Sequence, residues 1–91
     1  MCRNIRTLHN FEPPTSREEL QSAALQYVRK VSGMQKPSRA NEAAFERAVE
    51  AVAHATEHLL AELVTTAPPR DRDLEAARRK ARALERFGRV A

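Results

Sequence analysis

The chain has 91 residues and a formal net charge of +4 at pH 7, and 42% of it is apolar, with few aromatic side chains. Its single cysteine excludes an intramolecular disulfide, and no stretch is apolar enough for a signal peptide or a membrane span. We therefore expect a soluble cytoplasmic protein that does not bind membranes. A domain of this size buries only about 60–65% of the surface that its unfolded chain exposes, so we expect a thin core.

Charge is distributed unevenly along the chain. Residues 1–40 carry seven Lys or Arg against three acids, residues 41–69 carry one against five, and residues 70–91 carry eight against four. This basic, acidic, basic order favours a nucleic-acid or acidic partner, because Lys and Arg clusters bind phosphates by releasing counterions. An alternative interpretation is that the basic ends pair with the acidic middle.

Three segments of helical periodicity are separated by two proline-containing breaks, and none shows the period-two alternation of a strand. We predict an all-α fold of three helices, with a long central helix between two shorter ones. The predicted organisation is an N-terminal arm over residues 1–14, one helical domain over 15–88 and a tail over 89–91.

The first helix is predicted to begin at Thr15 or Ser16, since each is followed three residues later by a glutamate, the spacing of a capping box. It should end at Gly33, which can adopt the left-handed conformation, and Met34 beyond it would complete a Schellman motif. Its apolar stripe consists of Leu20, Ala24, Tyr27, Val28 and Val31.

The second helix is predicted to have Ser38 as its N-cap and to continue to about Thr66, a length of roughly 40 Å at 1.5 Å per residue. Pro68 and Pro69 should end it. One broad apolar face follows its length. The residues of this face that we expect to meet a partner are Phe45, Val49, Val52, Leu59, Leu60 and Leu63.

The third helix is predicted to start near Asp71 or Asp73, whose carboxylates suit a helix N-terminus, and to run to about Phe87 before Gly88. Its inward positions should be Leu74, Ala77, Ala81 and Leu84.

Two helices of 16–18 residues cannot cover the apolar face of the long helix. A second copy related by a two-fold axis would cover the rest, because a self-complementary surface closes without exposing new apolar area. We therefore predict a homodimer.

Four segments of the chain resemble a family of small, uncharacterised bacterial proteins, the DUF2277 family. They are the opening Met1–Ile5, the step Glu12-Pro13-Pro14, the run Tyr27–Gly33, and Lys36-Pro37. The resemblance extends to about residue 69, and the arginine-rich third helix is its least distinctive part. Because no activity is assigned to the family, the resemblance implies a compact helical bacterial protein and no mechanism.

Cys2 is a candidate nucleophile or metal ligand, because removal of the initiator methionine would leave an amine beside its thiol. His9 is close enough in sequence to act as its base. The alternative is that Cys2 is a small apolar residue packed under the helices.

His54 and His58 are spaced i, i+4, which points both imidazoles the same way, as in helical zinc sites. With Cys2 and His9 they would complete a plausible zinc ligand set. The alternative is two exposed histidines among acidic neighbours.

Arginines recur at helical spacing in the third helix, in a stripe that could follow a phosphate backbone. Without interleaved aromatic residues, any binding should have little sequence preference. The alternative is a solvated face of the third helix in which Glu75 pairs with Arg78 or Arg79. For the basic residues at the end of the first helix, a favourable interaction with the helix macrodipole is an equally good explanation. The candidates for a nucleic-acid or acidic-partner surface are Arg78, Arg79, Arg82, Arg86, Arg89, Arg29 and Lys30.

The sequence has no phosphate-binding loop, no dinucleotide fingerprint and no Ser/His/Asp set that periodicity would bring together. We therefore expect a noncatalytic interaction or oligomerisation module without a cofactor. Two alternatives remain open: a nucleic-acid-binding accessory protein, and a metal- or thiol-dependent protein centred on Cys2.

Overall fold

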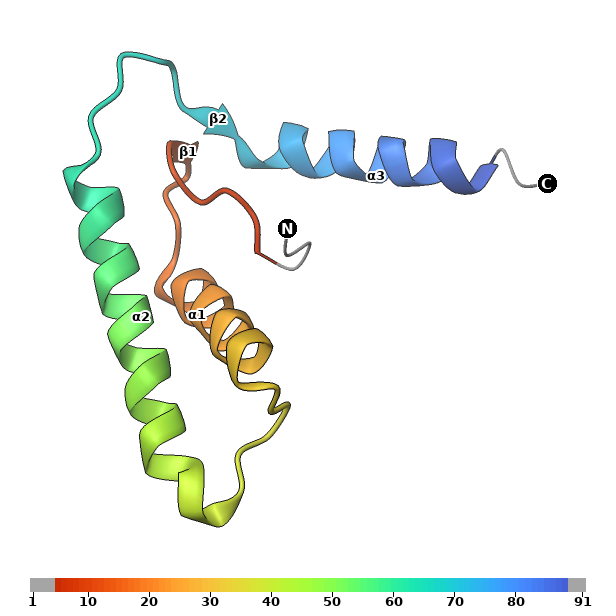
Figure 1. Cartoon of the computed structure of the whole chain (residues 1–91). Helices are drawn as coiled ribbons and strands as arrows, with labels where there is room; N and C mark the ends of the chain where they lie inside the picture. Colours follow the sequence, from red (N-terminus) through yellow and green to blue (C-terminus); the bar gives the residue numbers. More distant parts are fainter. Residues whose placement is uncertain (1–4, 89–91) are drawn as a thin grey trace. The chain divides into compact units, whose positions relative to one another are not determined.

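The computed structural model describes residues 5–88, and this part of the chain is mostly helical (Figure 1). Its elements in chain order are β1 (Phe11–Glu12), α1 (Arg17–Ser32), the 3-10 turn η1 (Arg39–Asn41), α2 (Glu42–Glu62), β2 (Arg70–Asp71) and α3 (Arg72–Gly88). The three predicted helices are present. The prediction of a chain without strands is wrong, because β1 and β2 form a small parallel pair.

The described chain divides into two compact units. The first contains residues 5–9 and 15–65, and therefore α1, η1 and α2; the second contains residues 10–14 and 66–88, and therefore both strands and α3. We describe each unit by itself.

Helix α1 begins and ends as predicted. The Ser16 hydroxyl accepts the backbone N–H of Glu19 at 3.2 Å, and the Glu19 carboxylate accepts the backbone N–H of Ser16 at 3.1 Å, which completes a capping box. At the other end Gly33 has φ 72°, and its N–H donates to the Arg29 carbonyl. The Met34 N–H donates to the Ser32 hydroxyl instead of a helix carbonyl, so the cap is the simpler αL motif and not the predicted Schellman motif.

Helix α2 is shorter than predicted at both ends. Ser38 starts the 3-10 turn and not the α-helix: its carbonyl accepts the Asn41 N–H at 2.9 Å, and its hydroxyl accepts the Asn41 side-chain amide at 2.8 Å. At the other end the backbone is already extended at Leu63. The helix has 21 residues, or about 31 Å, and continues without interruption.

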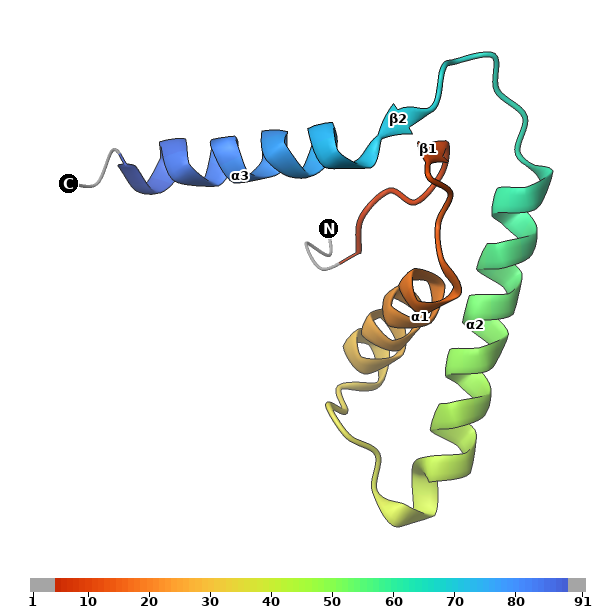
Figure 2. The same cartoon turned by 180° about the vertical axis from the view of Figure 1, so that it is seen from behind.

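The core of the first unit lies between α1 and α2, which form a helical hairpin (Figures 1 and 2). Leu20, Ala24 and Val28, spaced i, i+4, i+8, are buried on α1, and Phe45 is buried on α2. Ala24 is only 1% exposed, and such a small side chain lets the two helices approach closely. The core is thin, as the composition predicts.

The two strands of the second unit are held together around Asn10. Phe11 pairs with Arg70 and Glu12 with Asp71 in parallel register, and the Asn10 carbonyl accepts the Arg70 N–H at 2.7 Å. Asn10 has φ 62°, a conformation that asparagine tolerates better than most residues. Its side-chain amide donates to the carbonyls of residues 67 and 68.

The Phe11 ring is flanked by two guanidinium groups. The Arg70 and Arg72 guanidinium carbons lie 5.8 Å and 5.3 Å from the ring centroid, within cation–π range. Arg72 also donates from Nε to the Pro13 carbonyl. These contacts join residues separated by about sixty positions in the chain.

Helix α3 starts at the predicted place. The Asp71 carboxylate accepts the Leu74 N–H at 2.8 Å and so caps the first turn. The four positions predicted to face inward are exposed: Leu74, Ala77, Ala81 and Leu84.

We expect Ser16→Ala to lower the free energy of unfolding by about 1 kcal/mol, because it leaves the Glu19 N–H without its cap. Urea denaturation followed by circular dichroism measures this. Ser22→Ala, an exposed position inside α1, is the matched control and should not destabilise the protein. Equal midpoints for Ser16→Ala and the unmodified chain would contradict the role given to the capping box.

Candidate functional site

The apolar face predicted on the second helix is divided into a covered half and an open half. Phe45 is buried by α1, and Val49 and Val52 are half-buried. Nearer the C-terminal end Leu60 is half-buried, whereas Leu59 is 54% exposed and Leu63 is exposed as well.

The length of α1 explains this division. The first turns of α1 lie beside the middle of α2, where Arg17, Leu20 and Gln21 line a shallow pocket with α2 residues between Glu50 and Glu57. Because the hairpin is antiparallel, the rest of α1 extends toward the start of α2, and no part of it lies opposite the last turn of α2. Leu59 in the last turn of α2 is therefore left exposed.

Helical periodicity does not assign Val64 to the apolar face. This residue lies just after α2, in extended backbone, and is 94% exposed. It was overlooked because the predicted helix continued through it and placed it outside the apolar stripe. We call Leu59, Leu63 and Val64 together the distal patch.

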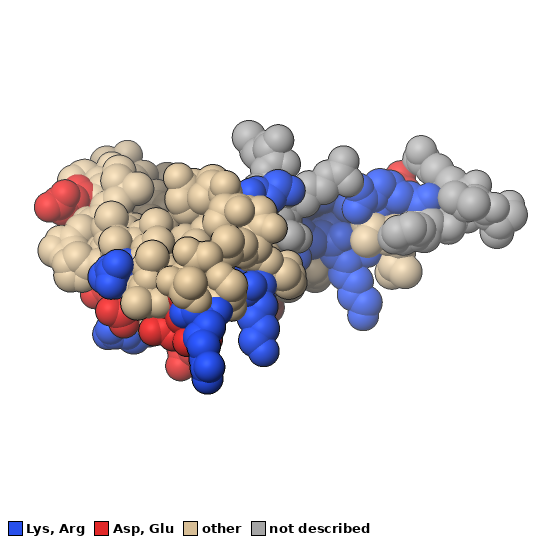
Figure 3. Space-filling model, turned by 60° about the horizontal axis from the view of Figure 1, so that its bottom comes forward, with Lys and Arg blue, Asp and Glu red and all other residues tan. Residues whose placement is uncertain are grey.

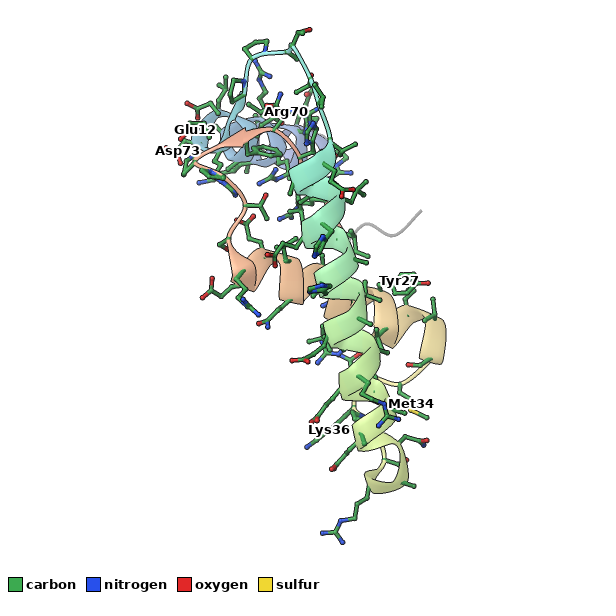
Figure 4. The ribbon with its side chains drawn as sticks, turned by 90° about the vertical axis from the view of Figure 1, so that its left-hand side faces the viewer. Glu12, Tyr27, Met34, Lys36, Arg70 and Asp73 are labelled. Carbon is green, nitrogen blue, oxygen red and sulfur yellow. The ribbon has the colours of Figure 1, made fainter. Side chains whose placement is uncertain are left out.

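Two apolar residues of α1 are also exposed. Tyr27 and Val31 belong to the predicted stripe, but they lie on its C-terminal half and are 47% and 65% exposed. Figure 4 labels Tyr27. These two residues are therefore separate from the distal patch, which lies at the other end of the hairpin.

A groove of about 1100 Å³ lies between α1, the loop that follows it and the first half of α2. Leu25, Phe45 and Val49 supply apolar surface within it. Charged side chains also line it: Glu46, Arg47 and Glu50 from α2, Arg29 from α1, and Lys36 from the loop. Lys36 is labelled in Figure 4. The sequence does not predict this groove, because the groove depends on how the two helices separate.

Lys and Arg side chains gather along α3 (Figure 3). Arg78, Arg82 and Arg86 are exposed and Arg79 is half-buried, while the predicted Arg89 lies outside the described residues. The Arg78 guanidinium lies 3.7 Å from the Glu75 carboxylate, one of the pairings that we expected. Of the basic candidates in the first unit, Lys30 is exposed and Arg29 donates from Nε to the Gln35 carbonyl at 2.9 Å.

The histidine candidates lie in the first unit. His54 and His58 are exposed on α2 with ring centroids 4.5 Å apart, and His9 is half-buried in the segment before β1. Cys2 lies outside the described residues. Between residues 5 and 88 the structure contains no group of three or more His, Cys, Asp or Glu placed to hold a metal ion.

The described chain is thus a small helical protein. Its first unit is a two-helix hairpin, and its second unit is a basic helix, α3, that follows a short pair of strands. A family model described as "Uncharacterized conserved protein (DUF2277)" matches residues 1–78, and the chain belongs to this family. No curated protein and no solved structure shows significant similarity to the chain. No helix within residues 5–88 has the length and apolar character needed to cross a membrane.

Proposed function

We propose that this protein is a noncatalytic helical module that associates with a second copy of itself through the distal patch. The observation that carries the proposal is the exposure of Leu59, Leu63 and Val64 at the end of α2 that α1 does not reach. The protein has a single cysteine, which cannot form a disulfide within the chain, and this is consistent with a function in the reducing cytosol of a bacterium.

The energetic reason for association is the apolar surface of the patch. Complete burial of one Leu or Val side chain contributes about 1.5–3 kcal/mol, and three neighbouring aliphatic side chains lie within six residues. In a two-fold dimer each residue of the patch is buried twice, once on each copy. Large exposed apolar side chains gathered at one end of a helix are typical of interaction sites.

We expect Leu59→Asp with Leu63→Asp to convert a dimer into a monomer at micromolar concentration, because two carboxylates on each copy would have to be buried together. Sedimentation velocity measures the change in mass. The matched control is Ala61→Asp, an exposed position about 200° around the helix from Leu59, which should remain dimeric. If the unmodified chain sediments as a monomer at high micromolar concentration, the proposal fails.

A second candidate function is the binding of nucleic acid through α3. It is favoured by the exposure of Arg78, Arg82 and Arg86 along one side of that helix. Arginines at this spacing suit successive phosphates, and binding would depend on charge more than on base sequence.

For this candidate we expect Arg82→Glu with Arg86→Glu to weaken binding to a random DNA duplex by about tenfold or more, and to reduce the slope of log affinity against log salt. Fluorescence anisotropy at low ionic strength measures both. Arg17→Glu with Arg39→Glu, two exposed positions of the first unit outside the candidate surface, is the control of equal charge change. Undetectable binding of the unmodified chain at low salt would exclude this function.

A further inference from the structure

Helix α3 carries an exposed apolar stripe. Leu74, Ala77, Ala81 and Leu84 recur at i, i+3, i+7, i+10 on one side of the helix, and Leu84 is 63% exposed. In proteins most of the stability of a helix comes from packing of its apolar face and not from intrinsic helix propensity. An apolar groove of similar length would bury this stripe and stabilise the helix.

The groove of the first unit has these properties. Its half-buried apolar lining residues are Leu25 and Val49. The lining extends along α1 from Gln21 to Arg29, about 12 Å at 1.5 Å per residue, and the stripe from Leu74 to Leu84 is about 15 Å long. An amphipathic helix that lays its apolar side into such a groove is a common mode of recognition.

On the α2 side of the groove the charges are complementary to those beside the stripe. Glu46 and Glu50, spaced i, i+4, line the groove on its α2 side and are exposed. Arg78 and Arg82, also spaced i, i+4, border the apolar stripe of α3 and are exposed. Arg47 is the one cation that α2 adds to the groove lining; Arg29 and Lys36 line the α1 and loop side.

We propose that α3 of one copy lies in the α1–α2 groove of a second copy, with its apolar stripe against Leu25 and Val49 and with Arg78 and Arg82 facing Glu46 and Glu50. The arrangement rests on the proposed homodimer and gives it a second, reciprocal contact. Two-fold symmetry makes each copy donate one helix and accept one. The charge pairs set the orientation of the helix, and burial of the stripe supplies the affinity.

Charge reversal tests this contact without knowledge of its exact register. One full-length variant carries Glu46→Arg and Glu50→Arg, and a second carries Arg78→Glu and Arg82→Glu. Each variant alone opposes like charges in both contacts of its homodimer, so we expect its dimer dissociation constant to rise by about tenfold or more. In an equimolar mixture both contacts of the mixed dimer are complementary, so mixed dimers should form with nearly the affinity of the unmodified chain.

Sedimentation velocity and native mass spectrometry of the single variants and their mixture provide the readout. A chain with Glu42→Arg and Glu57→Arg, two acids of α2 outside the groove, is the matched control and should dimerise normally. If the mixture stays as weakly associated as its parts, α3 does not occupy the groove of a second copy, and the inference is overturned.

The two proposals fail in different ways. A monomeric unmodified chain would overturn both. A dimer that Leu59→Asp with Leu63→Asp dissociates, but that neither charge-reversed variant weakens, would keep the proposed function and overturn the seating of α3 in the groove. Circular dichroism of every variant shows whether the helices are intact.

Discussion

The first unit depends on one contact, the packing of the α1 stripe Leu20, Ala24 and Val28 against α2 at Phe45. These four residues are the buried core of the described chain, so the buried apolar area that stabilises the hairpin is small. The capping box at Ser16 and the left-handed glycine at position 33 set the ends of α1, and hence which turns of α2 it covers. A helix of this length protects the first half of α2 and leaves the end of α2 open.

The second unit is stabilised in a different way. Backbone pairing between β1 and β2, the Asn10 amide and the guanidinium groups around Phe11 tie the segment before α1 to the start of α3. These contacts are polar or cation–π contacts, and they leave the apolar side of α3 in solvent. The second unit therefore consists of an amphipathic basic helix, α3, that follows the short β1–β2 pair.

The distal patch and the apolar stripe of α3 are related consequences of the small core. A chain of 91 residues with few large apolar side chains can bury only part of what its helices expose. The proposed association with a second copy would remove more apolar surface from water without enlarging the chain. Membership of the DUF2277 family assigns no activity, so the exposed surfaces are the strongest structural indication of what the protein does.

The ends of two helices could be predicted from the sequence alone, because they depend on interactions between residues close together in the chain. The capping box of α1, its terminal glycine and the start of α3 at Asp71 depend on residues within one helical turn, so their spacing was enough to predict them. The pairing of Arg78 with Glu75 follows from the same periodicity. The family, too, was recognisable from short runs such as Tyr27–Gly33.

Only the tertiary structure decided which half of the α2 face is covered, where the groove opens and that two-residue strands join Phe11 to Arg70. Strands so short carry no alternating pattern, and their pairing links positions about sixty residues apart. Likewise, the exposure of Leu59 and Val64 depends on where α1 begins beside α2, which no periodicity within α2 contains. Periodicity indicates which side of a helix is apolar, but burial depends on the neighbour that covers it.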